Sequence, residues 1–551
     1  MSLREPLDYL IPDETAAVAH AAFPKSTTIM RMRDTFGSLF FNQDFAHLYH
    51  AEGASAYSPA RLALITIFQF AEGLSDVQAA SAVAARIDWK YALALPLTAP
   101  AIDPSLLSDF RTRLLAGAAE LLLFTTLLER FSQDGLLRKR GRQRTDATHV
   151  LAAIRTLGRL ECIGETLRQA LNALAKAAPT WLRQHVPLSW LSTYAQRFDD
   201  YRLPEAKDKR TQLAEQIGQD GRMLLEWLAE AQAPAGLSEL PAVLVLRQVW
   251  QQQFEQTADE QVLRLRAAKD LPASADLICS PYDAEARYSI KRDTRWTGYK
   301  VHLTESCEPD RPNLITDVQT SAATKPDSVV LPEIQAALVE RDLAPAEHLV
   351  DSGYVSAANL VNSQKQQIDL IGPARGEGGW QARTEGGLTA SQFVIDWQAQ
   401  QVQCPAGKLS QRWSESRGRE GQAQISVRFE AAACRCCELR SSCVASKRGA
   451  RAMTLLPQAQ QQALQAARER QQTEGFTALY RARAGIEGTI GQGSRIADLH
   501  RTRYRGLAKT SLLHILIATA LNFLRVAAWL AERPRAHTRQ SAFAGLASLP
   551  I

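Results

Sequence analysis

The sequence predicts an α/β core with a helical amino-terminal domain, a long helical insertion and a small cysteine-containing insertion. Three observations support this organisation. Helix start and stop signals fill the first 135 residues, short β-type runs surround a helical run between residues 285 and 375, and five of the eight cysteines lie between Cys404 and Cys443. At about 150 residues per domain, a chain of 551 residues has room for three or four domains with cores of their own.

The composition and the apolar stretches exclude some classes of protein. With 46% hydrophobic residues the chain is not mainly disordered, and a net charge of +6 over this length is mild. Acidic residues among the first 25 do not fit an export signal. His514, Asn522 and Arg525 interrupt the most apolar late stretch, residues 512–530, which predicts a buried helix rather than a membrane span. We therefore expect a cytoplasmic protein.

Residues 1–135 are predicted to form a helical domain. Ser58 and Pro59 mark a helix start, Gly73 marks its end, and Ser75 starts a second helix that continues through Ile87. A third helix is expected at residues 105–115. The first two resemble a helix-turn-helix, a motif that reads DNA, so we assign this domain to DNA binding. A plain helical hairpin has the same pattern and stays an alternative.

Residues 136–157 begin the α/β core. A strand is expected at residues 145–150, after a basic run from Arg138 to Arg144 that is typical of a solvated linker. Residues 158–284 return to long amphipathic helices, expected at 161–175 and 212–229, without a cluster of chemistry-bearing residues. They are predicted to be a helical insertion.

The core is expected to continue in residues 285–375 and 455–535, around a cysteine-containing insertion at 376–454. Short β-type runs predict strands at residues 287–290, 298–304, 314–320, 348–350 and 368–371. Helical spacing is found at residues 327–341, from 458 through 487, and again at 511–531.

Three acidic residues are candidates for chemistry. Asp146 lies in one predicted strand and Asp351 ends another, and groups at the carboxyl ends of strands in an α/β sheet face a ligand crevice. Glu487 lies on a predicted helix. Taken alone, each aspartate is more often a cap or turn former, and a helical glutamate ordinarily faces solvent.

The residues around these acids carry a resemblance. Tyr480, Arg483 and Glu487, separated by two and three residues, resemble the signature around the last acid of bacterial insertion-sequence transposases of the DDE superfamily. Residues 145–150 and 349–354 are similar to the first and second acid blocks of that family. Other segments resemble it in the same order: residues 287–289 with 298–302, residues 503–507, and Asn522. Within the superfamily, the chain looks like the IS-four/IS-five clan and its IS-eleven-eighty-two-like branch.

The resemblance implies an RNase H-like catalytic core. In it Asp146, Asp351 and Glu487 would be the catalytic residues and would hold two Mg²⁺ or Mn²⁺ ions, with Asp146 bridging both ions. Cutting DNA places negative charge on an attacking and a leaving oxygen, and two divalent ions can stabilise both. Carboxylates suffice as ligands, because these ions prefer oxygen.

Basic residues near these blocks are candidates for DNA contact. Arg483, four positions before Glu487, shares its helical face and could orient that carboxylate or grip a phosphate, although a plain surface ion pair is the alternative. The family pattern has a lysine seven positions after the glutamate, whereas this chain has Ser494 there, followed by Arg495. The expected phosphate contacts are Arg483, Arg495, Arg503, Arg505 and Lys300.

The cysteine cluster indicates metal rather than disulfides, because eight cysteines are too few for a disulfide scaffold in a chain of this length. Cys404, Cys434, Cys437 and Cys443 could close a tetrahedral structural zinc site. Cys404 has no neighbouring cysteine, Cys436 could substitute for a neighbour, and reduced, unliganded thiols are the alternative. Three scattered cysteines are expected to be plain buried thiols: Cys162, Cys279 and Cys307.

Together these expectations predict a DNA transposase. It would bind the terminal inverted repeats of its own element, cut them with metal and join them to target DNA. Two alternatives stay open: a transposase-derived DNA-binding regulator that is catalytically silent, and an RNase H-like nuclease without strand transfer. Because two element ends must be handled together, a homodimer or larger assembly on double-stranded DNA is expected, at the bacterial nucleoid and without a membrane partner.

Overall fold

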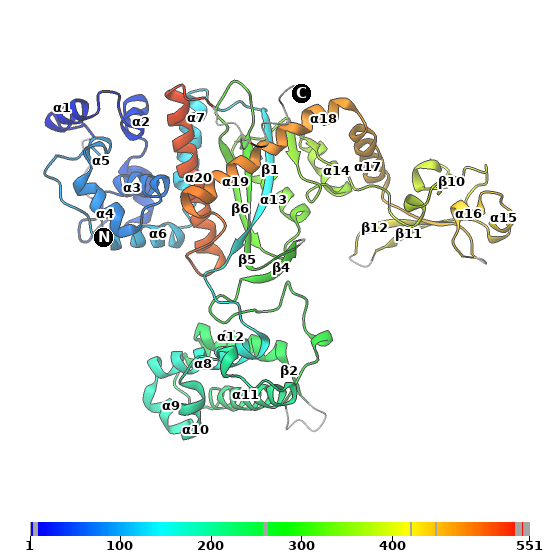
Figure 1. Ribbon diagram of the computed structural model, residues 1–551, viewed down its shortest axis with the longest axis horizontal. Coiled ribbons are helices and arrows are strands. Elements are labelled where there is room, and N and C mark those ends of the chain that lie inside the picture. The colour runs from blue at the N-terminus through cyan, green and yellow to red at the C-terminus, as the bar shows by residue number, and fades with distance from the viewer. Residues whose placement is uncertain are drawn as a thin grey trace.

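A six-stranded mixed sheet forms the centre of the computed structural model (Figure 1). The strand order is β4-β5-β1-β7-β8, and β6 also pairs with β5. β1 runs antiparallel to β5 and parallel to β7, which in turn runs parallel to β8. The strands have these bounds: β1 Arg142–Leu151, β4 Arg287–Lys291, β5 Thr294–Ser306, β6 Ile315–Ala322, β7 Glu347–Val350 and β8 Asp369–Ile371. All five strands predicted between residues 285 and 375 are confirmed to within a few residues.

The structure describes residues 2–3, 9–256, 263–291, 293–418, 421–446, 449–534 and 543. Residues 1 and 4–8 of the predicted amino-terminal domain, 257–262 of the helical insertion, 292 and 535 of the core, and 419–420 and 447–448 of the cysteine-containing insertion lie outside the described residues.

The basic run before β1 is not only a linker. β1 begins at Arg142, inside the run, and Arg144 is buried. The Nε of Arg144 donates to Oε1 of the fully buried Glu305 on β5 at 2.7 Å. The expectation of a solvated linker was therefore wrong for this part of the run, because a partner carboxylate on the neighbouring strand compensates the buried charge.

The amino-terminal part is helical, as predicted. Ser58 accepts from the Arg61 amide, Gly73 ends its helix with φ +67°, and Ser75 and Gln78 form a capping box. The second helix ends at Ala85 instead of continuing through Ile87, where the next one begins. The helices are α1 Asp13–Ala22, α2 Thr28–Phe36, η1 Asn42–Leu48, α3 Pro59–Glu72, α4 Asp76–Ala85, α5 Ile87–Ala92, α6 Ser105–Ala116 and α7 Leu122–Gln133.

The long helix α20 (Leu507–Leu530) lies between these helices and the sheet (Figure 1). It contacts α3 and β6, and one hydrophobic core includes residues of all three. The Asn522 side chain donates to the Ile315 carbonyl at 2.8 Å and accepts from its amide at 2.7 Å. Among the described residues α20 is the one helix long and apolar enough to cross a membrane, but 78% of its most apolar stretch is buried inside the protein. This burial agrees with the predicted core helix.

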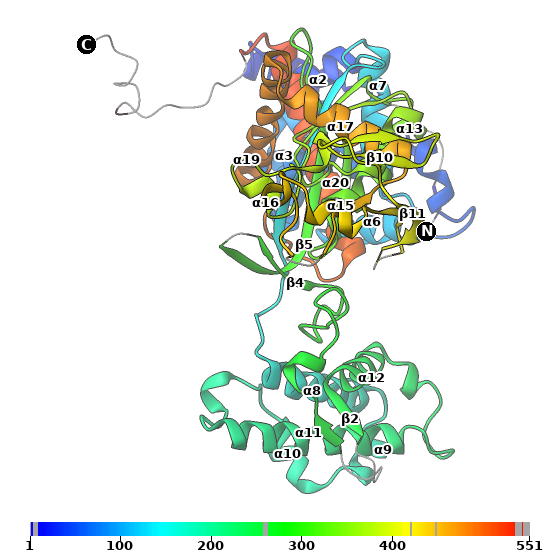
Figure 2. The same ribbon diagram turned by 90° about the vertical axis from the view of Figure 1, so that its right-hand side faces the viewer.

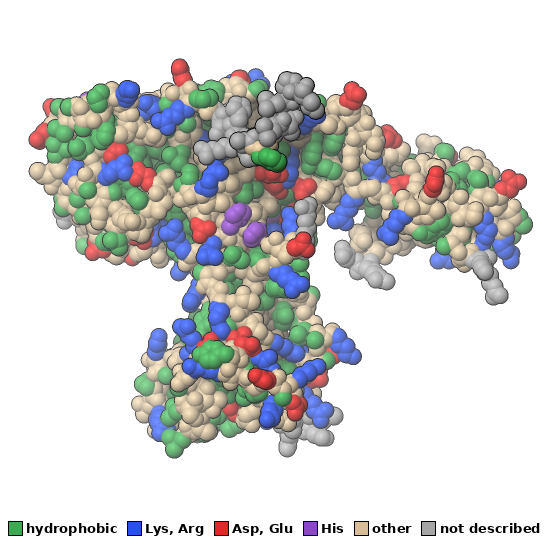
Figure 3. Space-filling model, viewed as in Figure 1, with side chains coloured by type: hydrophobic (Ala, Val, Ile, Leu, Met, Phe, Trp, Pro, Cys, Tyr) green, Lys and Arg blue, Asp and Glu red, His purple; other side chains and the backbone are tan. Residues whose placement is uncertain are grey.

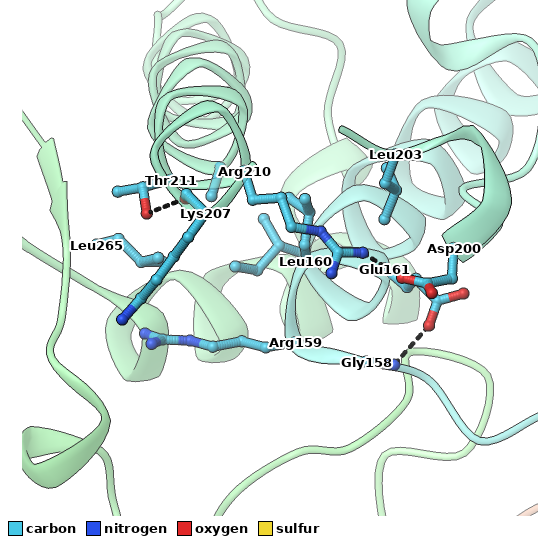
Figure 4. A pocket seen from close by; sticks show the side chains of 12 residues that line it. Gly158, Arg159, Leu160, Glu161, Asp200, Leu203, Lys207, Arg210, Thr211 and Leu265 are labelled. Atoms are coloured by element: carbon cyan, nitrogen blue, oxygen red, sulfur yellow. Dashed lines mark hydrogen bonds and ion pairs between the residues drawn. The ribbon is translucent and has the colours of Figure 1, made fainter. Parts of the chain in front are cut away.

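The helical insertion hangs below the sheet and has a hydrophobic core of its own (Figure 2). Both long helices expected here are present. A cavity of about 240 Å³ opens beside the first turn of α8, where Arg159 and Lys207 extend into it and Arg210 pairs with Asp200 (Figure 4). The elements are α8 Arg159–Ala177, α9 Pro179–His185, α10 Leu188–Tyr194, η2 Asp200–Arg202, α11 Lys207–Trp227, η3 Leu237–Glu239, α12 Pro241–Gln253, β2 Phe254–Gln256, β3 Leu263–Leu265 and η4 Ala268–Asp270.

The cysteine-containing segment and the amino-terminal helices lie on opposite sides of the sheet (Figure 1). A three-stranded sheet, β11-β12-β13, and a β9-β10 hairpin enclose a small core. The elements are η5 Gln381–Arg383, η6 Ala390–Gln392, β9 Val394–Asp396, β10 Gln401–Gln403, β11 Arg412–Arg417, β12 Ala423–Arg428, α15 Ala431–Arg435, α16 Arg440–Cys443 and β13 Ala452–Leu455.

The helix α13 (Asp327–Glu340) matches its prediction, and α14 (Ala357–Lys365) packs against α17 (Gln458–Gln471). The helical run expected from residue 458 through 487 is broken into three pieces. Thr473 caps α18 (Glu474–Tyr480), a 3₁₀ turn η7 (Arg481–Ala484) follows, and α19 (Gly485–Ala497) continues ten residues further than predicted.

Candidate active site

Asp146 and Asp351 lie next to each other at the centre of the sheet. β1 and β7 are parallel neighbours in which Thr145 pairs with Val350. Asp146 directly follows Thr145, and Asp351 directly follows Val350. The two acids are 205 positions apart in the sequence but adjacent across two neighbouring strands of the sheet. Asp351 follows the carboxyl end of its strand, whereas Asp146 lies inside its strand, at the fifth of the ten positions of β1.

Asp146 is largely buried, with 13% of its side chain exposed. Its Oδ1 accepts from the Ala147 amide at 2.8 Å. Burial raises the pKa of Asp146 above its ordinary value, while the positive charge of Arg483 acts in the opposite direction. A carboxylate with a raised pKa beside a second carboxylate is typical of a functional site.

Asp351 begins a tight turn after β7. Its Oδ1 accepts from the Ser352 amide at 2.6 Å, and its carbonyl accepts from the Tyr354 amide at 3.0 Å. Gly353 in this turn lies close to Asp327, because a Cβ at residue 353 would be 3.0 Å from Oδ2 of Asp327. The turn therefore holds the Asp351 carboxylate within electrostatic reach of Asp146 and brings Asp327, a fourth acid, near it.

Arg483 links two of the three predicted acids. Its guanidinium donates to Oδ2 of Asp146, and its Nη1 lies 3.4 Å from Oε1 of Glu487. The Arg483 side chain is 14% exposed, so it is not a plain surface pair, although the Glu487 side chain is 68% exposed. The charges of both aspartates and of Glu487 raise the pKa of Arg483, against the effect of its burial. All three acids therefore lie around one arginine.

A buried ion network fixes the helix that carries Glu487. The carboxylate of Glu305 accepts from Thr489 on α19 at 2.5 Å and from Arg525 on α20 at 2.8 Å, in addition to Arg144. Arg144 also donates to the carbonyl of Ala482, just before α19. One carboxylate thus ties β5 to β1, α19 and α20, which sets the position of α19 relative to the aspartates.

Gly485 permits the close approach of α19 to this network. A Cβ at residue 485 would be 2.1 Å from Nη1 of Arg144. Arg144 cannot move away easily, because its side chain is only 8% exposed and holds Glu305. A side chain at residue 485 would therefore push α19 away from β1.

Tyr480 packs in an apolar cluster beside the acids. Its ring stacks on Phe476 with centroids 5.4 Å apart, next to Leu349 and Ile371. Burial raises the pKa of Tyr480, and Asp146, Asp351 and Glu487 add to that shift. The tyrosine is thus both part of the packing and within electrostatic reach of the site.

The other basic residues predicted to contact DNA lie in different surroundings. Arg495 is exposed on α19, while the Ser494 hydroxyl donates back to the Ile490 carbonyl at 2.8 Å. Lys300 is not free, since its Nζ lies 2.6 Å from Oδ1 of Asp327. Arg503 and Arg505 are exposed and lie over the rings of Phe70 and Tyr282. Only Arg483 directly contacts the acids.

Several residues near the site were not predicted. The rings of His149 and His500 stack with centroids 5.1 Å apart, and Lys291 influences both Asp146 and His149. Figure 3 shows histidine side chains at the centre of this face, with basic side chains around them. In the sequence, His500 is marked only by its position between Arg495 and Arg501. Its link to β1, where the Leu151 amide donates to the His500 carbonyl, is visible only in the fold.

The donor set suits a hard divalent cation. Asp146, Asp351 and Glu487 supply only carboxylate oxygens, from the middle of one strand, the turn after its parallel neighbour and one helix. Within the part of the chain that the structure describes, no three His, Cys, Asp or Glu side chains already lie at metal-binding spacing. Arg483 explains this spacing, because it lies between Asp146 and Glu487. The carboxylate oxygens of the three acids are therefore of the kind that binds a divalent cation. To bind that cation, Glu487 would have to give up its contact with Arg483.

The four cysteines predicted to bind zinc come together, at a distance from the acids. Cys404, Cys434, Cys437 and Cys443 line one small cavity of the cysteine-containing insertion. Cys436 is exposed and does not line it. Of the three scattered cysteines, Cys162 is buried, whereas Cys279 and Cys307 are only half-buried, so the expectation of plain buried thiols was wrong for these two.

Two regions of the chain match known protein families. Residues 17–113 match the family described as Transposase domain (DUF772), and residues 403–527 match Transposase DDE domain. The second match includes Glu487 and Arg483 but neither aspartate. No curated protein and no solved structure matches the chain.

The matches agree with the architecture. The first falls within the helical amino-terminal part, and a DDE domain implies an RNase H-like fold, consistent with the mixed sheet around β1. The branch within the superfamily and the domain boundaries stay predictions. Two regions of the chain thus match transposase domain models, one of them of the DDE type, and these matches support a DDE transposase.

Proposed function

We propose that the protein is the DNA transposase of an insertion sequence, which binds terminal inverted repeats, cleaves the DNA with metal and transfers the strand to target DNA. The observation that carries this proposal is the adjacency of Asp146, inside β1, and Asp351, directly after the parallel neighbour β7, with Arg483 paired to both Asp146 and Glu487.

Each residue has a role in this proposal. Asp146, Asp351 and Glu487 would hold two Mg²⁺ or Mn²⁺ ions, which when bound supply charge stabilisation at the attacking and leaving oxygens. Arg483 opposes the rise that burial causes in the pKa of Asp146, and it would orient Glu487. The Glu305 network holds α19 in place, so that these groups stay in register with the sheet.

DNA would reach the site along basic residues. The exposed Arg495, Arg503 and Arg505 are placed to neutralise phosphates, which makes binding salt-dependent. Lys300, paired with Asp327, would contact DNA only by leaving that pair. We assign recognition of the repeats to the amino-terminal domain, expect two or more copies on the DNA, and expect the protein in the cytoplasm, at the nucleoid.

The test is DNA nicking by the purified protein on labelled element ends with Mg²⁺ or Mn²⁺. We expect cleavage by the parent chain and a loss of more than about a hundredfold for Asp146→Asn, Asp351→Asn and Glu487→Gln. A matched control is Asp369→Asn, an exposed acid at the start of β8 in the same sheet, paired with Arg470. It should cleave at the parental rate.

The products separate the alternatives. Joined strands support the transposase, while cleavage without joining under all conditions would indicate an RNase H-like nuclease. Specific binding without cleavage with either metal would indicate a silent regulator. Equal losses in Asp369→Asn and in the three acid variants would contradict the assigned site.

A further inference from the structure

Four cysteines from separate parts of the small insertion converge on one cavity. Cys404 follows β10, Cys434 lies in α15, Cys437 follows it, and Cys443 ends α16. All four line the same cavity, and the other three all lie within electrostatic reach of the Cys443 thiol; no three of them already lie at the spacing of a bound ion, so the thiols would have to close around it. Thirty positions separate Cys404 from Cys434, so the fold, and not local spacing, brings them together.

The loops that carry the cysteines are tight turns of the kind that surround structural zinc. The Gly407 amide donates to the Cys404 carbonyl at 2.8 Å, and the Cys404 amide donates to the Lys408 carbonyl at 2.9 Å. Gly407 has φ +74°, which this turn requires. Cys434 and Cys437 have the two-residue spacing common in zinc knuckles.

The size and charge of the cavity limit its occupant. Its volume is about 30 Å³, which holds an ion or a water molecule but no organic ligand. Arg440 and Arg451 line it, and the Nη1 of Arg451 donates to the Cys443 carbonyl at 3.0 Å. The Nε of Arg451, a residue that is only 9% exposed, is buried without a hydrogen-bond partner. Positive groups beside four thiols would offset the excess negative charge of a metal–thiolate centre.

The small core of this segment indicates that a bound metal or a cross-link contributes to its stability. Its core consists of eight buried residues, one of which is Cys443 itself, and Cys404 and Cys434 pack against that core. A domain with so small a core is commonly stabilised by a metal or by disulfides. None of its described cysteines forms a disulfide.

We propose that Cys404, Cys434, Cys437 and Cys443 bind one structural Zn²⁺ ion that orders the cysteine-containing insertion. The thiol groups would bind as thiolates and release their protons, without any oxidant. Cys436 takes no part. This site is separate from the three acids and does not rest on the proposed function.

The metal content of the full-length protein tests the proposal. After purification without added metal and without chelator, elemental analysis should find about one zinc per chain. Titration of the thiols with a mercurial, followed by a colorimetric zinc indicator, should release that zinc as the thiols react. Zinc-free protein, with zinc still absent after incubation with ZnCl₂ and buffer exchange, would overturn the proposal.

Single substitutions locate the ion. Serine at each of the four positions should lower the zinc content to well under half, whereas Cys436→Ser, beside two of them, should keep it. Zinc retained by all four variants, or lost equally in Cys436→Ser, would contradict the assignment.

Cobalt gives a readout on the parent chain, for the case that serine variants fail to fold. The chelated protein loaded with Co²⁺ should show the intense visible bands of a tetrahedral thiolate site, and one equivalent of Zn²⁺ should remove them. Weak octahedral bands would overturn the proposal. None of these readouts depends on DNA cleavage, so failure here and failure of the proposed function can be told apart.

Discussion

The guanidinium of Arg483 donates to the carboxylate of Asp146, 337 positions away in the sequence. This contact joins the turn before α19 to the central strand β1, so that Asp146 and Glu487 share one arginine. It turns a short sequence signature into a spatial relationship, and its consequences can be measured.

Replacing Arg483 should change the pH dependence of cleavage. Burial already raises the pKa of Asp146, and Arg483 opposes that rise. In Arg483→Gln the pKa of Asp146 should rise further, so that less of it is ionised at a given pH and the acid limb of the rate profile moves to higher pH. Single-turnover nicking across a pH series measures this shift. Arg495→Gln, on the exposed face of α19, should weaken binding without moving the limb; equal shifts in both variants would count against the pair.

Gly485 should not tolerate a side chain. In Gly485→Ala the new Cβ would meet Arg144, which cannot leave without breaking its pair with Glu305. We expect a loss of roughly 2–4 kcal/mol in the free energy of unfolding. Gly488→Ala is the matched control, since nothing lies within 4 Å of its Cβ position, and it should gain up to about 1 kcal/mol from helix propensity. Denaturant unfolding distinguishes the two, and a neutral Gly485→Ala would show that Arg144 yields freely.

The Glu305 network should dominate the charge contribution to stability. Glu305→Gln leaves Arg144 and Arg525 in the interior without their counter-charge, which should cost about 3–5 kcal/mol. Lys139→Ala breaks an ion pair with Asp342 whose side chains are 73% and 79% exposed, so it should change stability by less than about 1 kcal/mol. Chemical denaturation of both variants gives the comparison. Similar values would mean that the network relaxes or hydrates.

Three buried histidines should make the fold sensitive to mild acid. Burial lowers the pKa of His302, His348 and His514 to about 3. In the unfolded chain they bind protons near pH ~6.5, so below that pH the unfolded state takes up more protons and stability falls until the folded-state pKa is reached. Each histidine contributes up to about 1.4 kcal/mol per pH unit over this window.

The variant His514→Asn tests this effect. Its side-chain oxygen can keep the bond to Thr320, which lies 2.7 Å from Nδ1 of His514, but it does not titrate. Unfolding at about pH 7 and about pH 5.5 should show a smaller drop than in the parent. His47→Gln, at an exposed histidine, should keep the parental drop. An unchanged slope in His514→Asn would mean that this residue is protonated in the folded state.

Local patterns were enough for much of the fold. Period-two runs located the five strands between residues 285 and 375, and Ser58, Gly73 and Ser75 marked real helix ends. The breaks between α17, α18 and α19 were missed, because Thr473 acts through a cap and η7 through a tightened turn, neither of which interrupts the apolar period. The second half of α19 was also missed, because the helix contains four glycines, which have low helix propensity; tertiary packing stabilises it.

In the candidate site, too, some residues could be predicted from local sequence patterns and others could not. The three acids were predicted from blocks of residues; in the structure Arg483 contacts Asp146 and Glu487, and Asp351 lies within its electrostatic reach. Glu305 was not identified, since its value depends on Arg144, 161 positions earlier, and on Arg525, 220 positions later. Lys300 was predicted to be a DNA contact because strand spacing gives no sign of Asp327, which pairs with it in the fold. Buried charge partners are a long-range property that composition does not reveal.

The position of α20 has a consequence for biosynthesis. The helices between residues 13 and 133 complete their core only with residues 507–530, which are synthesised after the whole central sheet. The nascent chain must therefore keep an apolar surface open until α20 has been made, which exposes that surface to chaperones and proteases.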